Sequence, residues 1–106
     1  MKNYKMVILC ASAMSSGLIV DELKDIAPKH DINLDIECFA SLRFRSYDYS
    51  NVDLILLAPQ VKSQKESIES YLKESGYNIP IYLIPMREYG LVKGEPILKG
   101  ALELCN

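Results

Sequence analysis

The chain has 106 residues, a length that fits one domain spanning residues 1–106. Its net charge of −2 gives no electrostatic reason to expect nucleic acid as a partner. No apolar run approaches the roughly 18–20 residues that a membrane-spanning helix needs, and we expect a cytoplasmic protein. Its three cysteines, Cys10, Cys38 and Cys105, form no C-x-x-C pair and accompany a single histidine, His30, so neither a disulfide framework nor a metal site is expected.

The first predicted strand, residues 5–10, is apolar and ends at Cys10. A run of mostly small residues follows it: Ala11, Ser12, Ala13, Met14, Ser15, Ser16 and Gly17. Apolar residues at helical spacing then predict a helix over residues 16–29, with Pro28 in its last turn. This order would place the Cys10 sulfur over the positive end of a helix, where a thiolate is stabilised and backbone N–H groups can hold an anion.

Three further strands are predicted. Residues 34–39 alternate polar and apolar side chains, which is typical of a half-exposed strand at the edge of a sheet. Residues 52–58 are almost continuously apolar, as expected for a strand covered on both faces. Residues 79–84 contain β-branched side chains around a tyrosine and form the fourth predicted strand.

Two more helices are predicted between and after these strands. The first covers residues 61–75 and ends before Gly76, and the second covers residues 96–104 and begins at Pro96. Residues 41–51 are rich in arginine and tyrosine and are predicted to form a short helix or an ordered loop. Cys38 and Cys105 are interpreted as buried small hydrophobic residues, and His30 as a solvated side chain rather than a catalytic one.

Alternation of strands and helices predicts an α/β fold with three layers, in which helices flank a four-stranded parallel sheet of order 2-1-3-4. In that order a ligand site lies outside the carboxyl ends of the first and third strands. The segments 10–17 and 58–61 meet there. The sequence therefore predicts an anion loop, similar to that of a phosphatase, after the first strand.

The residue types in this loop suit a phosphoryl group. Small side chains leave the backbone amides accessible to a tetrahedral anion, serines add hydroxyl donors, and Cys10 supplies a nucleophile. The hypothesis is that Cys10 takes up a phosphoryl group and passes it on. The alternative interpretation is structural: residues 11–17 form a turn, and Cys10 fills the core.

Other known loops fit less well. The nucleotide-binding patterns G-x-x-x-x-G-K-[ST] and G-x-G-x-x-G are absent. Ala13 stands where a thioredoxin-type motif has its second cysteine, and Ser16 stands where a cysteine phosphatase has its phosphate-clamping arginine. A low-molecular-weight cysteine phosphatase and a non-catalytic binding or redox-sensing module of the same fold remain as alternatives.

Three short motifs carry a resemblance to a known family: Cys10-x-x-x-Met14-Ser15, Pro59-Gln60 and Tyr89-Gly90. With them the sequence resembles the enzyme IIB component of the phosphoenolpyruvate-dependent sugar phosphotransferase system, lactose/cellobiose type. The likeness covers essentially the whole chain in length and order of elements. Ala13 and Ala58 stand where the family has glycines, and a positive φ at Ala13 would cost about 1 kcal/mol or more.

The resemblance implies a phosphotransferase that works as a relay. Cys10 would accept phosphate from a phosphohistidine of a IIA protein and give it to a cellobiose-, lactose- or chitobiose-like sugar entering through a membrane IIC transporter. The backbone of residues 11–17 would bind the phosphoryl oxygens, and no metal or other cofactor would be needed. Pro59, Gln60 and Tyr89 are candidates for the rim of the site; the alternatives are a plain loop residue for Gln60 and a core-closing aromatic for Tyr89.

Overall fold

A computed structural model of the chain describes residues 1–105, with the side chains of residues 13–15 outside the described part. Its four strands form one parallel sheet in the order β2-β1-β3-β4. Their bounds are as follows: β1 Lys2–Cys10, β2 Ile32–Ala40, β3 Leu54–Leu57 and β4 Ile81–Leu83. The predicted strand order is therefore confirmed, and β1 and β2 extend further toward their amino ends than their apolar patterns indicated.

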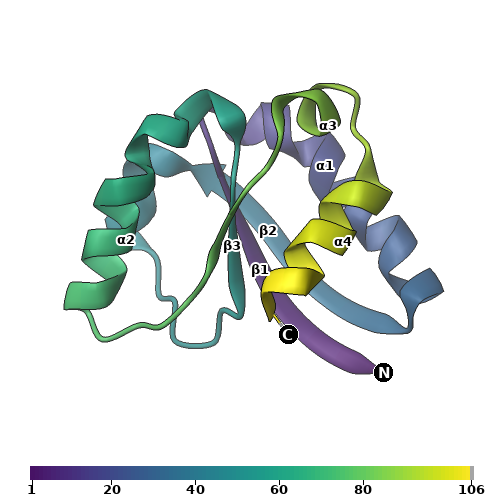
Figure 1. Ribbon diagram of the computed structural model, residues 1–106, viewed down its shortest axis with the longest axis horizontal. Coiled ribbons are helices and arrows are strands. Elements are labelled where there is room, and N and C mark those ends of the chain that lie inside the picture. Colours follow the sequence, from purple (N-terminus) through teal and green to yellow (C-terminus); the bar gives the residue numbers. More distant parts are fainter. Residues whose placement is uncertain (106) are drawn as a thin grey trace.

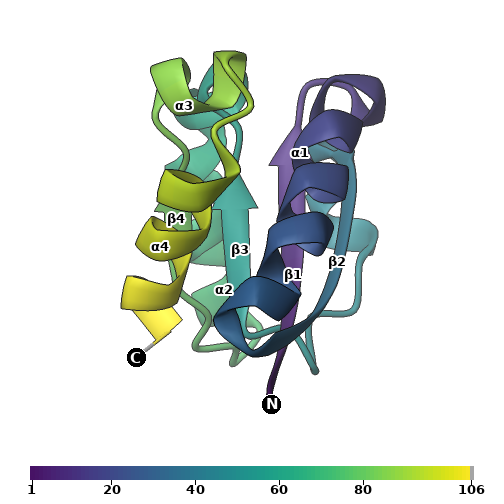
Figure 2. The same cartoon turned by 90° about the vertical axis from the view of Figure 1, so that its right-hand side faces the viewer.

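Helices cover both faces of the sheet, as Figures 1 and 2 show. Helices α1 (Ala13–Ile26) and α4 (Gly94–Cys105) pack side by side on one face, and α2 (Lys65–Glu74) lies on the other. A five-residue helix, α3 (Met86–Gly90), follows β4 and was not predicted. The three-layer α/β architecture is confirmed. In the part of the chain that is described, no helix is long and apolar enough to cross a membrane.

Burial along the strands follows their positions in the sheet. All four residues of β3 are fully buried, since helices cover this central strand on both sides. Buried and exposed residues alternate along much of β2, which pairs only with β1 among the described strands and thus forms an edge. Both burial patterns agree with the predictions from the sequence.

Helix boundaries differ from the predictions at three places. Helix α1 begins at Ala13 rather than Ser16, and it continues into a 3₁₀ turn, η1 (Ala27–His30), that contains Pro28. Helix α2 is preceded by a 3₁₀ segment, η3 (Pro59–Gln64). Helix α4 begins two residues before Pro96. Gly76 ends α2 with a φ of +83°, as predicted for a glycine after a helix.

Residues 41–51 pack into the core rather than forming a free loop. They begin with a 3₁₀ segment, η2 (Ser41–Ser46), pass through Tyr47, whose backbone is extended, and end in a turn at residues 50–51. The Tyr49 side chain is buried, and its hydroxyl donates a hydrogen bond to the Phe44 carbonyl at 2.7 Å. Ring contacts join Tyr49 to Tyr47 and Tyr77. The tyrosines that were unexplained in the sequence are therefore largely structural.

Candidate functional site

Cys10 lies at the carboxyl end of β1, between β2 and β3. The residue is 0% exposed. Its Sγ is 2.9 Å from the carbonyl oxygen of Ser12 and 3.6 Å from that of Phe39, and the S–H group donates toward both. Both neighbours are hydrogen-bond acceptors, so the polar contacts of the sulfur are with main-chain carbonyl groups. Attack by the sulfur on a ligand requires it to turn away from the Ser12 carbonyl.

The chain enters a helix almost immediately after Cys10. Only Ala11 and Ser12, both exposed, separate β1 from the first residue of α1. The predicted loop of residues 11–17 is therefore two residues long, and residues 13–17 belong to the helix. Alanine has the highest helix propensity, so Ala13 suits this position, and the cost considered for a positive φ does not arise.

The start of α1 supplies what an anion needs. The N–H groups of the first helical turn have no acceptor within the helix and point toward its amino end. The helix dipole adds partial positive charge at the same place. No cationic side chain is present between Ala11 and Gly17. Backbone N–H groups and serine hydroxyls are thus the donors that this segment can offer to a phosphoryl group beside Cys10.

The segment after β3 lies beside the same strand end. The Ala58 N–H donates to the Leu9 carbonyl at 2.9 Å, and η3 packs against β1. Ala58 has φ −66° and ψ 145°, which alanine adopts without strain. Pro59 is buried, whereas Gln60 is exposed. Of this predicted rim pair, Gln60 is therefore the side chain that a ligand or partner can reach.

Tyr89 is connected to the start of α1. Tyr89 is 7% exposed, and its hydroxyl oxygen lies 2.9 Å from the Ser16 hydroxyl oxygen in a buried hydrogen bond. The Ser16 hydroxyl is thus directed to Tyr89 on α3. Tyr89 also belongs to the hydrophobic core. It therefore acts as the core-closing aromatic that was considered, and it also anchors the helix that follows Cys10.

Two features of the site could not be predicted from any pattern in the sequence. One is the pair of carbonyl groups that face the Cys10 sulfur, since every residue carries a carbonyl. The other is the Ser16–Tyr89 hydrogen bond, whose partners are 73 positions apart. A parallel sheet of known order places the carboxyl ends of β1 and β3 together. It does not specify which side chain of the segment after β4 contacts the start of α1.

The other thiols have environments that differ from that of Cys10. Burial raises the pKa of the Cys38 thiol, and the charges of Cys10 and Glu37 add to the effect. Burial, followed by the charge of Asp53, raises the pKa of the Cys105 thiol. Both residues pack against the core but are only partly buried, so they are less enclosed than the sequence predicted, and their thiols remain protonated at neutral pH. Within residues 1–105, no group of three or more His, Cys, Asp or Glu side chains could hold a metal ion.

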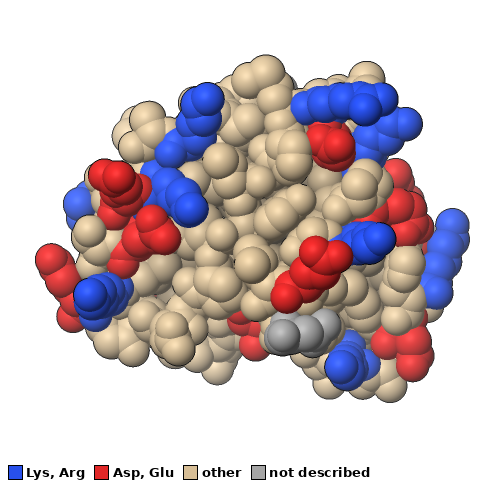
Figure 3. Space-filling view, viewed as in Figure 1, with Lys and Arg blue, Asp and Glu red and all other residues tan. Residues whose placement is uncertain are grey.

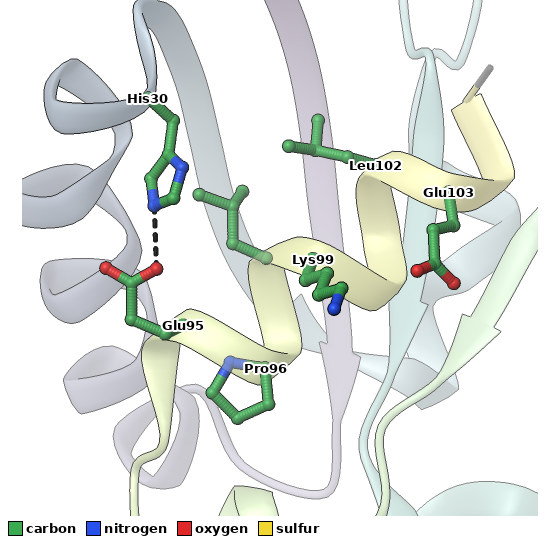
Figure 4. A pocket seen from close by; sticks show the side chains of 7 residues that line it. His30, Glu95, Pro96, Lys99, Leu102 and Glu103 are labelled. Atoms are coloured by element: carbon green, nitrogen blue, oxygen red, sulfur yellow. Dashed lines mark hydrogen bonds and ion pairs between the residues drawn. The ribbon is translucent and has the colours of Figure 1, made fainter.

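A cavity of about 630 Å³ lies between η1 and α4, as Figure 4 shows. Leu98 and Leu102 of α4 form its apolar part, and His30 Nε2 contacts Glu95 Oε2 at 2.6 Å across it. Since η1 directly precedes β2, the cavity lies toward the amino end of that strand, away from Cys10. His30 is exposed and ion-paired to Glu95 when protonated, so it takes no part in the Cys10 site.

Known proteins of similar sequence and structure point to one family. The model of the family described as PTS system, lactose/cellobiose specific IIB subunit, matches residues 5–100. The cellobiose-specific EIIB component of Lactococcus lactis subsp. lactis is 29% identical over the full length of both chains. The oligo-beta-mannoside-specific EIIB component of Bacillus subtilis is 27% identical and covers 94% of each chain.

A solved structure agrees with the sequence matches. The cellobiose-specific phosphotransferase IIB component from Borrelia burgdorferi superposes with a TM-score of 0.73 at 30% identity, covering 95% of this chain and 90% of its own. The chain therefore belongs to the lactose/cellobiose-specific IIB family of the sugar phosphotransferase system, and it is a phosphotransferase.

Proposed function

We propose that Cys10 is the residue of this IIB protein that carries phosphate. It accepts a phosphoryl group from a phosphohistidine of a IIA protein in the cytoplasm and passes it to a sugar entering through a membrane IIC transporter. Residues 1–106 act as a single carrier domain. The observation that carries the proposal is the position of Cys10 at the carboxyl end of β1, directly before the amino end of α1.

The two transfers are exchanges of one bond for another. In the first, the Cys10 sulfur attacks phosphorus, the N–P bond to the donor imidazole breaks, and the thiol proton moves to the imidazole nitrogen. In the second, a sugar hydroxyl attacks phosphorus, the S–P bond breaks, and the hydroxyl proton returns to the sulfur. No oxidant, metal or other cofactor is needed for either exchange.

Backbone groups take the main part in stabilising the phosphoryl oxygens. Amides of residues 11–17, at the amino end of α1, are placed to donate hydrogen bonds as charge develops on these oxygens. A guanidinium clamp, which would hold the phosphate bidentately, is missing from this segment. The phosphoryl group is thus stabilised but not trapped, which suits a protein that must give it away.

The rim residues have more limited roles. Gln60 is exposed at the start of η3 and can donate to a phosphoryl oxygen or to a partner. Pro59 is buried and fixes the direction of the chain beside β1. Tyr89 acts through its hydrogen bond to Ser16 and is a positioning residue.

The sugar that we propose is a β-linked disaccharide or short oligosaccharide, similar to cellobiose, lactose or chitobiose. The support comes from the names of relatives, which specify cellobiose and oligo-beta-mannoside. A growth test on single sugars, in cells from which the corresponding gene is deleted, identifies the sugar.

Replacement of Cys10 tests the carrier role. The wild-type chain, incubated with a phosphorylated IIA protein of the lactose/cellobiose type, should acquire one phosphate that mass spectrometry locates on Cys10. Cys10→Ser should acquire none, because a serine hydroxyl in this environment is a much weaker nucleophile. Cys38→Ser and Cys105→Ser are the matched controls and should be phosphorylated as the wild type is.

Two results would contradict the proposal: no phosphate on the wild type, or undiminished phosphate on Cys10→Ser. Hydrolysis of para-nitrophenyl phosphate separates a carrier from a phosphatase. We expect no turnover, since residues 11–17 lack the arginine on which cysteine phosphatases depend. Steady turnover that disappears in Cys10→Ser would favour the phosphatase instead.

A further inference from the structure

Basic side chains follow three of the four strands at the carboxyl edge of the sheet. We call them the cationic rim: Arg43, Lys62, Lys65, Arg87 and Lys93. Two acidic residues accompany them, Glu66 directly after Lys65 and Glu88 directly after Arg87, although the whole chain carries a net charge of −2. Residues 11–18, which follow β1, carry no charge. Positive charge is therefore gathered around the Cys10 strand end, while the rest of the chain is acidic.

The fold places these segments around Cys10. Arg43 lies in η2, which follows β2 directly, and the last residue of β2, Ala40, pairs with Cys10. Lys62 lies in η3, which packs against β1. Arg87 lies in α3, the helix whose Tyr89 is bonded to the start of α1. In Figure 3, blue side chains gather over the amino-terminal end of α2 and over α3, with an uncharged stretch between them.

The charges of the rim are available to a partner. Arg43, Lys62, Arg87 and Lys93 are exposed, and Lys65 is partly exposed. Neither of the ion pairs recorded within residues 1–105, which involve Lys5 and His30, includes a rim residue.

Arg45 differs from the rim residues. Its guanidinium stacks on the Phe44 ring at 4.3 Å from the centroid, and it lines a hollow with Glu66 and Glu74. Its contacts lie on the flank of α2, whereas Arg43 of the same segment lines a hollow with Glu37 and Phe39 of β2, the strand that pairs with β1.

Exposed apolar side chains accompany the rim. Leu42 is 85% exposed and precedes Arg43, and Met86 is 68% exposed and precedes Arg87. Leu18 on α1 and Leu91 after α3 are also exposed. Apolar and methionine side chains bordered by arginine are typical of protein–protein interfaces. This combination favours a protein partner over a plain polyanion.

We propose that this surface docks the phosphoryl donor protein through an acidic face with an apolar centre, which the cationic rim attracts. The inference rests on the proposed phosphoryl transfer to Cys10 and adds the chemistry of the partner. The rim borders the phosphoryl site without lining it, since residues 11–17 are uncharged. It therefore accelerates encounter with an anionic, phosphorylated partner and leaves the phosphoryl group free to move on.

Removal of rim charge tests the proposal. The rim variant is Arg43→Gln/Lys62→Gln/Arg87→Gln, and the matched control is Lys24→Gln/Lys29→Gln/Lys99→Gln, which removes the same charge from exposed positions outside the rim. The measurements are the second-order rate constant of transfer from a phosphorylated IIA protein of the lactose/cellobiose type and the affinity for its unphosphorylated form. Circular dichroism verifies that both variants are folded.

We expect the rim variant to lose about tenfold in the rate constant at low salt, and the control to stay within about twofold of the wild type. The difference should largely disappear between ~0.1 M and ~1 M salt, as the Debye length falls from about 10 Å to about 3 Å. Leu42→Ser should weaken binding at both salt concentrations, whereas its control, Leu104→Ser on α4, should not.

Equal losses in the rim variant and its control, or an effect that salt does not change, would overturn the proposal. If IIA binding depends on the rim but no phosphate reaches Cys10, the docking surface stands and the carrier role fails. If Cys10 is phosphorylated and the rim variant behaves as the wild type, the carrier role stands and the docking proposal fails. Rim-dependent binding to phosphatidylglycerol vesicles, with IIA binding unaffected, would assign the rim to a membrane surface and overturn the proposal.

Discussion

The Cys10 sulfur has a polar environment made almost wholly of backbone. Carbonyl groups of Ser12 and Phe39 face it in the resting structure, and the amides at the start of α1 lie beyond the two-residue link. The carbonyl groups accept from the S–H group, and the amides can donate to a bound anion. In the phosphoryl transfer that we propose, the sulfur turns away from the Ser12 carbonyl toward these amides.

Tyr89 provides a prediction at the scale of single residues. Tyr89→Phe removes the hydroxyl that pairs with Ser16 at 2.9 Å and leaves the buried serine without this partner. The free energy of unfolding should fall by about 1–3 kcal/mol, the usual cost of an unpaired buried polar group. Urea denaturation monitored by circular dichroism measures the loss.

The matched variants are Ser16→Ala and the double variant Ser16→Ala/Tyr89→Phe. If the two hydroxyls act as a pair, the double variant should lose less stability than the sum of the single losses. Additive losses would show that the hydrogen bond between them contributes nothing measurable.

At the scale of elements, glycines decide how closely helices approach their neighbours. A Cβ at Gly100 of α4 would overlap the hydroxyl end of the Tyr82 ring on β4, whereas a Cβ at Gly17 of α1 would meet nothing within 4 Å. Gly100→Ala should therefore destabilise the chain by about 1–3 kcal/mol through overpacking. The same change at Gly17 should stabilise it by up to about 1 kcal/mol, since alanine favours the helix.

Thermal unfolding of the two glycine variants gives the comparison. Both variants replace glycine by alanine within a helix, so the gain in helix propensity is the same. A lower Tm for Gly100→Ala and a higher Tm for Gly17→Ala would therefore show the cost of the contact with Tyr82. Shifts of the same sign would mean that helix propensity outweighs packing at Gly100, and that α4 can move away from β4 at little cost.

The boundaries of elements were the part of the fold that local patterns predicted least well. The serines and glycine of residues 12–17 resemble a loop, yet α1 begins at Ala13, because its apolar face packs on the sheet and so outweighs weak local propensity. Helix α3 was missed because five residues with no apolar periodicity give no helical signal. Boundaries of this kind depend on tertiary contacts.

For the whole molecule, one buried and two partly buried tyrosines predict that stability falls in alkali. Burial is the main cause that raises the pKa of Tyr49 above its ordinary value of 10.0, and its neutral hydroxyl donates to the Phe44 carbonyl. Burial likewise raises the pKa values of Tyr47 and Tyr82. A raised folded-state pKa means that the unfolded chain loses these protons first. The stabilisation is therefore complete below about pH 10 and is lost as the pH rises above that value.

Urea denaturation at a series of pH values tests this dependence. The free energy of unfolding should fall steeply above about pH 10, and Tyr49 should contribute up to about 1.4 kcal/mol per pH unit. Tyr49→Phe should be less stable at neutral pH, because the bond to Phe44 is lost, but its stability should fall less steeply in alkali. Equal slopes for the two proteins would rule out Tyr49 as a source.

The sequence by itself determined the class and order of the fold and the place of Cys10 in it. Apolar runs alternating with helical patterns predicted a parallel sheet of order 2-1-3-4, and this order puts Cys10 and Pro59-Gln60 at neighbouring strand ends. These features depend on periodicity and on general rules of chain connection, which local sequence carries. They were sufficient to predict the position of the site, and three short motifs carried the family resemblance.

Only the tertiary structure decided how that site is built. It placed the Ser12 and Phe39 carbonyls at the Cys10 sulfur and joined Tyr89 to Ser16. It also gathered the cationic rim, whose members come from three separate segments, at one edge of the molecule. Contacts of this kind depend on the distance between groups far apart in the chain, and the packing of helices on the sheet fixes that distance.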